Sequence, residues 1–371
     1  MITRVSLYAF RNYTKAEVPL RPGINLFLGA NAQGKTNLVE AVYLAATGRS
    51  PRASVLAEMV MWEHNAARVR LDLDEDGDAH VLEVRLERDD GPRTKRRLAL
   101  DDRPISAAAL AGRVKTVIFH PEEMTLIRGS GEGRRRLLNG LMAQSEVGYA
   151  ATLSRYQRVL EQRNQLLKRI AQELEPVSAL DWWTEELGRL GGELVTARRT
   201  MLDHLGPLVA QRYARIADAA GAAGEELGLR YAPSVDDPQD PASAIVAELA
   251  RRRGEELARG QTAAGPHRDD LAFTIGGVPA AQHASQGQQR TAILAFKLAE
   301  VDVLSSGGTP PVLLLDDVMS ELDAPRRTLL LELVETVPQA LITSAEQSYF
   351  PTGFAERVEA RRVMAGTLVA A

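Results

Sequence analysis

Gly29-Ala30-Asn31-Ala32-Gln33-Gly34-Lys35-Thr36 is the stretch of the 371-residue chain that decides its fold. A largely apolar run, residues 24–28, precedes it and predicts a buried strand. Apolar residues at helical spacing follow in residues 37–47 and predict a helix. A strand, a glycine loop and a helix in this order are the context of a phosphate-binding loop. The sequence therefore predicts an α/β fold that binds a nucleotide.

The residue types of this loop suit an anionic ligand. Glycine permits a positive φ and brings backbone N–H groups close to the anion, and the helix that follows adds the positive end of its dipole. Lys35 is expected to reach the β- and γ-phosphates and to act in catalysis, while the Thr36 hydroxyl is expected to ligate Mg²⁺. The predicted nucleotide contacts are Gly29, Ala30, Asn31, Ala32, Gln33, Gly34, Lys35 and Thr36.

The composition excludes several classes of protein. An apolar share of 45% and a charged share of 25% are typical of globular proteins. There is no cysteine, which excludes disulfides, thiol nucleophiles and cysteine metal sites. No apolar run approaches the ~18 residues that span a membrane, so we expect a cytoplasmic protein without a membrane partner. Because the net charge is −4, nucleic-acid binding would require local basic patches.

A second acidic segment predicts the other half of the nucleotide site. Residues 311–317, Pro311-Val312-Leu313-Leu314-Leu315-Asp316-Asp317, predict a parallel strand that is buried on both faces. Asp316 would lie at its carboxyl end, where open α/β sheets bind ligands, and is expected to hold Mg²⁺. Asp317 follows it and is the expected catalytic base, which would polarise the attacking water. Residues 340–344 predict a further strand.

We divide the rest of the chain into three segments, residues 1–120, 121–264 and 265–371. In the first segment, alternating residues predict an antiparallel meander, with a turn at 88–92 and a strand at 93–100. In the second, helical spacing over residues 146–219, interrupted at Pro176, predicts a short antiparallel helical arm.

Charged clusters leave alternatives open. The runs at 95–97, 134–136 and 251–253 are either solvated faces or phosphate contacts with DNA. His267, beside Asp269 and Asp270, would suit a hydrolytic dyad or a metal site, but one histidine beside two aspartates is weak evidence for either.

Four segments in order, 29–36, 285–290, 311–317 and 320–323, resemble the Walker A, signature, Walker B and D-loop of the ABC ATPase class. The helical insertion between the first two is similar to the SMC-type branch. More narrowly, the chain resembles the RecF family of bacterial recombination-repair proteins along almost its whole length. The further matching segments are Phe10-Arg11-Asn12-Tyr13, His120-Pro121-Glu122 and Gly265-Pro266-His267-Arg268-Asp269-Asp270.

This resemblance implies an ABC-type P-loop ATPase head with an antiparallel β-subdomain, a helical lobe and a short arm. Residues 1–120 would form the first part of ATPase lobe I, residues 121–264 the helical lobe II with the arm, and residues 265–371 the part that completes the head. It also implies an ATP-dependent head-to-head homodimer, slow ATP hydrolysis, and binding to single-/double-strand DNA junctions. The implied protein partners are RecR and RecO, with an indirect role in loading RecA. Ser285, Gly287 and Gln288 would contact the nucleotide of the opposite protomer, and Arg11 and Asn12 would lie near the nucleotide.

The chain departs from the general ABC pattern in three places. Asp317 stands where a glutamate is usual, residues 341–344 contain no switch histidine, and no glutamine stands out at the lobe junction.

Proteins with two other functions also contain these ATPase motifs. A transporter motor subunit would need a membrane partner, whereas a small-molecule kinase would work without dimerising.

Overall fold

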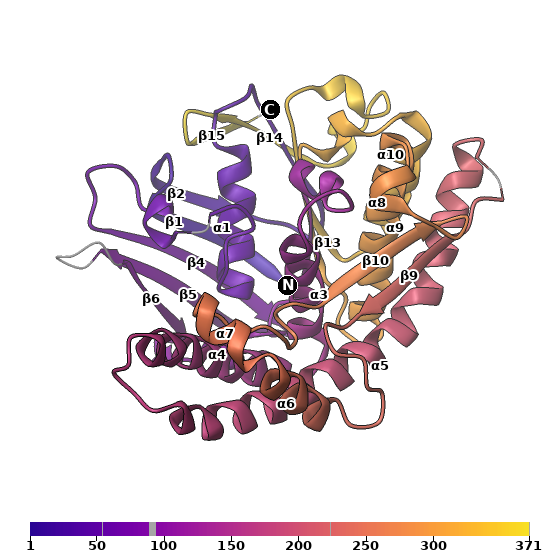
Figure 1. Cartoon of the computed structure of the whole chain (residues 1–371). Helices are drawn as coiled ribbons and strands as arrows, with labels where there is room; N and C mark the ends of the chain where they lie inside the picture. Colours follow the sequence, from indigo (N-terminus) through magenta and orange to yellow (C-terminus); the bar gives the residue numbers. More distant parts are fainter. Residues whose placement is uncertain (54, 89–93, 223, 371) are drawn as a thin grey trace. The chain divides into compact units, whose positions relative to one another are not determined.

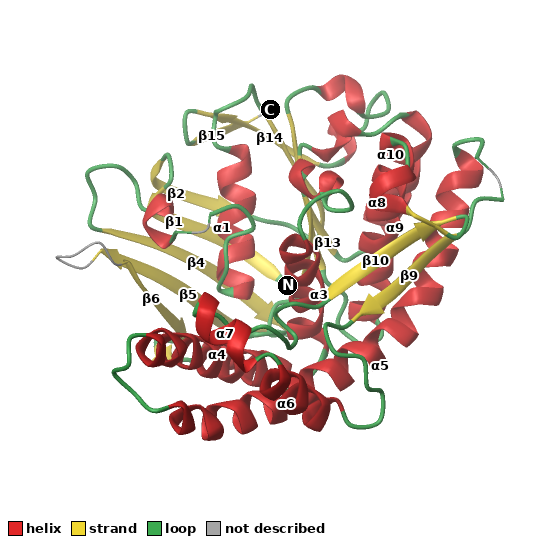
Figure 2. Ribbon diagram, viewed as in Figure 1, coloured by secondary structure: helices red, strands yellow, loops and turns green. Residues whose placement is uncertain are grey.

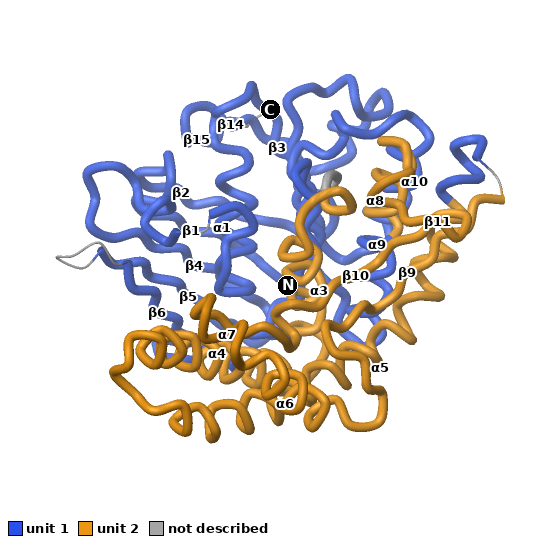
Figure 3. Tube along the Cα trace, viewed as in Figure 1, with its two compact units in different colours: residues 1–124, 216–222, 296–371 blue, residues 125–215, 223–295 orange. Residues whose placement is uncertain are grey.

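The computed structural model describes residues 1–53, 55–88, 94–222 and 224–370 (Figure 1). The chain forms two compact units (Figure 3). Unit 1 contains residues 1–124, 216–222 and 296–371, and unit 2 contains residues 125–215 and 223–295. The division of the sequence at residues 120 and 264 stays a prediction. The turn predicted at 88–92 lies, apart from Arg88, outside the described residues, as does Arg93.

A mostly parallel sheet carries the glycine loop in unit 1. Its strand order is β15-β14-β3-β13-β12-β8, and only β15 runs antiparallel to its neighbour. Every residue of β8, β12 and β13 is buried, as expected for parallel strands covered on both faces. The strands predicted before the loop, within 311–317 and at 340–344 are therefore confirmed. Their bounds are β3 Gly23–Leu28, β8 Thr116–Phe119, β12 Val312–Asp316, β13 Gln339–Ser344, β14 Glu359–Met364 and β15 Thr367–Ala370.

The second sheet of unit 1 is antiparallel, with the order β2-β1-β4-β5-β6-β7. Along β4, buried and exposed residues alternate, so one face is apolar and the other faces solvent. The predicted antiparallel β-subdomain is confirmed. The bounds are β1 Ile2–Phe10, β2 Tyr13–Pro19, β4 Ala66–Glu75, β5 Asp78–Arg88, β6 Thr94–Leu100 and β7 Arg103–Pro104.

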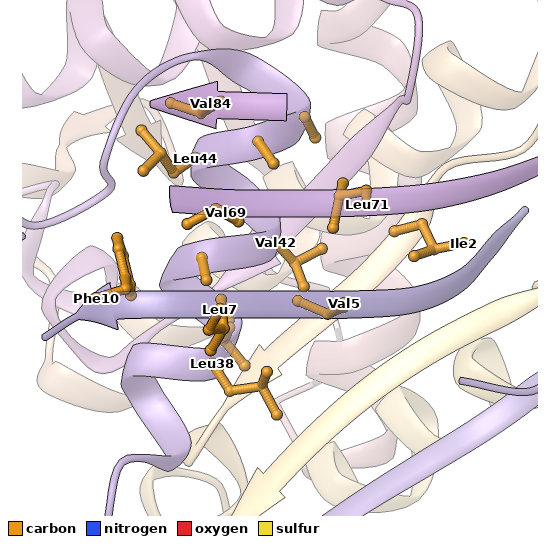
Figure 4. Close-up of a cluster of buried hydrophobic side chains, with 14 of the residues drawn as sticks. Ile2, Val5, Leu7, Phe10, Leu38, Val42, Leu44, Val69, Leu71 and Val84 are labelled. Atoms are coloured by element: carbon orange, nitrogen blue, oxygen red, sulfur yellow. The ribbon is translucent and has the colours of Figure 1, made fainter. Parts of the chain in front are cut away.

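Helix α1, Lys35–Thr47, contacts strands of both sheets in unit 1. Figure 4 shows Leu38, Val42 and Leu44 of this helix beside apolar side chains of β1, β4 and β5. A helix that is buried on more than one side carries apolar residues around much of its circumference. This core fixes the helix whose first turn begins at the glycine loop. The other helices of unit 1 are η1 Leu56–Met59, α2 Ala107–Leu110, η2 Pro121–Thr125, η4 Val318–Glu321, α10 Ala324–Thr336, η5 Gln347–Tyr349 and η6 Ala355–Arg357.

Unit 2 is mainly helical (Figure 2). Helices α4, Tyr149–Ala171, and α5, Asp181–Ala219, are joined near η3, Val177–Leu180, and the last residues of α5, from Ile216 on, belong to unit 1. Arg163 of α4 bonds to Thr184 of α5, whereas Tyr149 bonds to Arg198, so the two helices run antiparallel. The predicted helical arm is confirmed. The other elements are α3 Gly131–Ser145, α6 Pro241–Arg251, α7 Arg253–Arg259, α8 Ala280–His283 and a sheet of β9 Leu227–Ala232, β10 Asp270–Ile275 and β11 Val278–Pro279; helix α9, Gln286–Ser305, begins in unit 2 and ends in unit 1.

Buried polar groups hold unit 2 together at the segment 265–270. The Arg198 side chain is 2% exposed and donates to the carbonyl of Pro266 and to Asp269, which also accepts from Tyr231. His267 Nδ1 lies 2.7 Å from the Tyr156 hydroxyl. These contacts bind strand, loop and helix to one another, so the segment has a structural role. Among the described residues, no group of three or more His, Cys, Asp or Glu side chains could hold a metal ion, so the metal-site interpretation is wrong.

The buried imidazole of His267 predicts a loss of stability in acid. Burial lowers the pKa of His267 to about 4, whereas an unfolded histidine titrates near ~6.5. The unfolded chain therefore binds a proton that the folded chain excludes, and the free energy of unfolding falls as the pH drops from 6.5 to 4, by roughly 3 kcal/mol in total. Urea unfolding followed by circular dichroism at several pH values measures this change.

The variant His267→Gln should lose this part of the pH dependence, whatever its stability at neutral pH. His283→Gln, at an exposed position of the same unit, is the matched control and should keep it. Equal pH dependence in the wild type and in His267→Gln would contradict the prediction.

Candidate nucleotide-binding site

The glycine loop turns sharply before α1. Gly34 has φ +113°, and a Cβ there would lie 2.8 Å from the side chain of Asn12. A Cβ on Gly29 would lie 2.5 Å from the carbonyl oxygen of Val363. Only glycine fits both positions. Lys35, which is 5% exposed, donates to the carbonyls of Gly29 at 2.6 Å and Ala30 at 3.0 Å. Burial lowers the pKa of Lys35, and the nearby Asp317 and Asp316 act in the opposite direction.

Thr36 and Asp316 meet although 280 residues separate them. The Thr36 hydroxyl donates to Asp316 Oδ1 at 2.9 Å. Asp316 is 5% exposed; burial raises the pKa of its carboxyl group, and hydrogen bonds from Thr36 and Thr343 partly oppose this. A buried carboxylate beside a threonine hydroxyl is an oxygen donor pair of the kind that Mg²⁺ prefers. These residues therefore fit the predicted cation.

Asp317 has a left-handed backbone with φ +52°. Its N–H donates to the carbonyl and the hydroxyl of Thr343, and its Oδ1 accepts from the N–H of Ala345 at 3.2 Å. These bonds direct the side chain toward the end of the neighbouring strand β13. Most residues avoid this conformation, but aspartate adopts it more readily.

A cavity of about 340 Å³ in unit 1 brings the predicted residues together. Besides the loop, Asp316 and Asp317, it is lined by Asn37, Arg52, Pro121 and Glu122. None of these four was predicted as a site residue, although Pro121 and Glu122 belong to a segment that the sequence analysis matched to the RecF family. Glu122 follows β8, the neighbour of β12, so the rule about carboxyl ends of parallel strands could have found it. A hydrogen bond from His120 lowers the pKa of Glu122 to about 2, so this carboxylate is ionised at neutral pH.

Arg11 and Asn12 lie in the turn between β1 and β2, where Asn12 contacts the glycine loop and Arg11 contacts helix α1. Asn12 donates to the carbonyl of Gln33 at 3.1 Å and accepts from Asn37. Arg11 makes two 2.8 Å bonds to the buried Glu40, which also accepts from Arg52. Burial acts to raise the pKa of Glu40, but hydrogen bonds from Arg11, Ser50 and Arg52 outweigh it, and the pKa is lowered. A direct contact of Arg11 or Asn12 with a nucleotide stays a prediction.

The signature segment belongs to unit 2 and starts α9. The Ser285 hydroxyl accepts from the N–H of Gln288, and the Gln288 side chain accepts from the N–H of Ser285 at 2.8 Å. This reciprocal pair is a capping box, and it fixes the first turn of the helix that contains Gly287. Contacts of Ser285, Gly287 and Gln288 with a nucleotide stay a prediction.

The basic clusters differ in how much of their charge is available. Arg134 is paired with Asp270 and bonds to three carbonyls, and Arg135 donates to the carbonyl of Asp269, so both have structural roles. The cluster at 251–253 is paired with Glu248, Glu255 and Asp181. Internal partners therefore account for most of the arginines that the sequence offered as DNA contacts in these two runs.

The solvent face of the antiparallel sheet carries another set of basic residues. Lys15, Arg68, Arg85 and Arg97, together with Tyr8, form what we call the basic row. Strand register aligns Lys15 with Tyr8, Tyr8 with Arg68, Arg68 with Arg85, and Arg85 with Arg97. The three arginine side chains are 53%, 52% and 70% exposed. Like charges that face each other across strands destabilise a sheet, and Glu83 and Glu87 offset only part of this. Only Arg97 belongs to a cluster singled out from the sequence.

The sheet order, the glycine loop and the Thr36–Asp316 pair define a P-loop ATPase head of the ABC type. The family model described as RecF/RecN/SMC N terminal domain matches residues 1–363. The chain belongs to the RecF family, since it is 37% identical to the DNA replication and repair protein RecF of Chloroflexus aurantiacus, with 97% of both chains covered. It is 38% identical to that of Streptomyces avermitilis, covering 94% of this chain and 95% of that protein.

Solved structures agree with this assignment. The recombination mediator protein RecF in the RecFOR pathway, solved with ATPrS, has a TM-score of 0.88 and 29% identity, covering 100% of this chain and 98% of the other. The Smc head domain of Pyrococcus furiosus, with a TM-score of 0.54 and 16% identity over 100% and 95% of the chains, shows the shared fold alone. In the part of the chain that the structure describes, we found no helix both long and apolar enough to cross a bilayer.

Proposed function

We propose that this chain is an ATP-dependent DNA-binding protein of replication and recombinational repair. The observation that carries the proposal is the Thr36–Asp316 hydrogen bond at the mouth of the glycine loop. Relatives named for DNA replication and repair, and RecF structures named for bound ATP, support it. They favour this function over a transporter motor subunit or a small-molecule kinase. A protein that acts on DNA with RecR, RecO and, indirectly, RecA would work in the cytoplasm.

The residues of the cavity would have distinct roles. Lys35, freed from the two loop carbonyls, would bind the β- and γ-phosphates. Thr36 and Asp316 would hold Mg²⁺, which neutralises phosphate charge when it is bound. Asp317 would take a proton from the water that attacks the γ-phosphorus, while the bond from that phosphorus to the oxygen bridging to the β-phosphorus breaks and releases ADP. The Asp317 side chain is one methylene shorter than the glutamate usual at this position, and this difference is consistent with slow hydrolysis.

ATP would also hold two protomers together. Ser285, Gly287 and Gln288 of one protomer would complete the site around the triphosphate bound by the other. A nucleotide that binds the dimer better than the monomer shifts association by mass action. The basic row supports DNA as the further partner, because four cations and a tyrosine in one line of about 19 Å suit a polyanion better than a small ligand. Preference for single-/double-strand junctions is part of the proposal.

Mass in solution tests the dimer. Light scattering should give a monomer without nucleotide and a dimer with ATP and Mg²⁺ when hydrolysis is slow or blocked. Ser285→Arg should keep ATP binding within about threefold yet stay monomeric and lose hydrolysis, since its side chain would fill the composite site. Ser306→Arg, exposed beyond the other end of α9, is the matched control and should dimerise. A wild-type chain that remains monomeric with trapped ATP would contradict the proposal.

A further inference from the structure

A buried hydroxyl lies between the two acidic residues of the site. Thr343 is 0% exposed and belongs to β13, which pairs with the strand before the glycine loop and with β12. Register places Thr343 directly beside Asp316 and beside Phe27 on the other side. No sequence prediction gave this residue a role; it was noted only because no histidine occurs there.

The Thr343 hydroxyl contacts both neighbouring aspartates. Its oxygen lies 2.9 Å from Asp316 Oδ1 and 3.0 Å from the N–H of Asp317. A hydroxyl has one proton, and the carboxylate oxygen at 2.9 Å is nearer than the Leu315 carbonyl at 3.4 Å. Because hydrogen bonds to ionised acceptors are the stronger ones, the proton goes to Asp316. The same oxygen then accepts from the backbone of Asp317.

These two bonds control different features of the site. The hydrogen bonds from Thr343 and Thr36 both end on Asp316 Oδ1, and these two donors fix the rotation of the carboxylate. The bond from the Asp317 N–H to Thr343 helps to hold Asp317 in its left-handed conformation, which is costly by itself. The conformation directs the Asp317 side chain toward Ala345 instead of onward along β12.

We infer that Thr343 is a positioning residue that sets the Asp316 and Asp317 carboxylates relative to each other for cation binding and ATP hydrolysis. The inference rests on the proposed function of the cavity. Partners of this kind change metal affinity or turnover by about 10–100-fold when they are removed. Thr343 does not itself contact the reacting atoms. A hydroxyl that merely satisfied buried polar groups would contribute to stability but not to these quantities.

The test compares Thr343→Val, which keeps the shape and removes the hydroxyl, with Thr343→Ser, which keeps the hydroxyl. Thr116→Val is the matched control, because Thr116 is equally buried at the opposite end of the same sheet. Four quantities are measured: the affinity for Mn²⁺ with a non-hydrolysable ATP analogue by electron paramagnetic resonance, kcat for ATP, KM for ATP, and the unfolding temperature. Thr343→Val should bind Mn²⁺ about tenfold more weakly and lose about 10–100-fold in kcat, with KM within about threefold.

Thr343→Ser should recover the Mn²⁺ affinity and kcat to within about threefold of the wild type. The inference is overturned if Thr343→Val lowers the unfolding temperature without changing Mn²⁺ affinity or kcat, if serine fails to rescue, or if Thr116→Val has the same effects. Failure of the wild type itself to bind Mn²⁺ and the analogue would instead overturn the proposed function, and the inference with it.

Discussion

Replacing Lys297 with methionine is expected to lower the free energy of unfolding of unit 1 by about 3–5 kcal/mol, as for one partner of a buried ion pair. Lys297 is 2% exposed and lies 2.9 Å from Glu123 and 3.1 Å from Glu300. Burial acts to lower the pKa of Lys297, but the two carboxylates outweigh it and the pKa is raised, so the ammonium group stays charged. Without it, two buried carboxylates would face each other without a cation.

The size of the effect follows from the burial of all three groups. Glu123 and Glu300 are 8% and 4% exposed, and burial raises the pKa of Glu300 even with Lys297 present. Methionine fills nearly the same volume as the lysine stem, so the loss would come from charge and not from a cavity. Calorimetry or urea unfolding at pH 7.5 measures it.

Two further variants separate charge from packing. Lys297→Met combined with Glu123→Gln and Glu300→Gln removes every charge, and it should recover most of the lost stability. Lys15→Met, at an exposed position of the same unit, should change stability by less than about 0.5 kcal/mol. A loss below about 1 kcal/mol for Lys297→Met alone would show that the cluster is solvated or rearranges.

The sequence predicted the parts of the site that depend on local order. A glycine loop between a strand and a helix is written in consecutive residues, and so is the apolar run that ends at Asp316. Both could be found because a parallel strand buried on both faces is a nearly continuous apolar run, which Asn25 interrupts in β3. The position of Asp316 beside Thr36 then followed from the rule that ligands bind at the carboxyl ends of such strands.

The sequence did not predict contacts made across the sheets. Thr343 is an ordinary strand residue until register puts it beside Asp316, and Lys297 looks like a solvated helix residue until Glu123 is brought to it. The same limit explains the arginine clusters. Arg134 has the charge of a DNA contact, but the fold pairs it with Asp270, 136 residues away. The basic row consists of residues from five strands, so no window of the sequence contains it.

Reversing three charges of the basic row is expected to weaken DNA binding several-hundredfold at 0.1 M salt. Affinity falls as salt rises, and each phosphate contact makes the plot of log affinity against log salt steeper by about 0.9. Losing three contacts should therefore make the plot less steep by about 2.7 and, at 0.1 M salt, lower the affinity by roughly 300–500-fold. The variant is Arg68→Glu, Arg85→Glu and Arg97→Glu, whose side chains are at least half exposed and therefore tolerate the change. Fluorescence anisotropy with a gapped duplex, with ATP and Mg²⁺ present, from 50 to 300 mM salt measures both quantities.

A control with the same change in net charge decides whether the row or the overall charge is responsible. Arg155, Arg158 and Arg169 are exposed on helix α4 of the arm, and their reversal to glutamate matches the row variant charge for charge. If long-range repulsion by a more acidic protein were the cause, both variants would lose affinity equally, whereas direct phosphate contacts predict a lower salt slope for the row variant alone. Because the glycine loop lies outside the row, ATP binding should stay within about twofold of the wild type in both. An unchanged salt slope in the row variant would remove the antiparallel sheet from the DNA-binding surface and leave the proposed nucleotide site untouched.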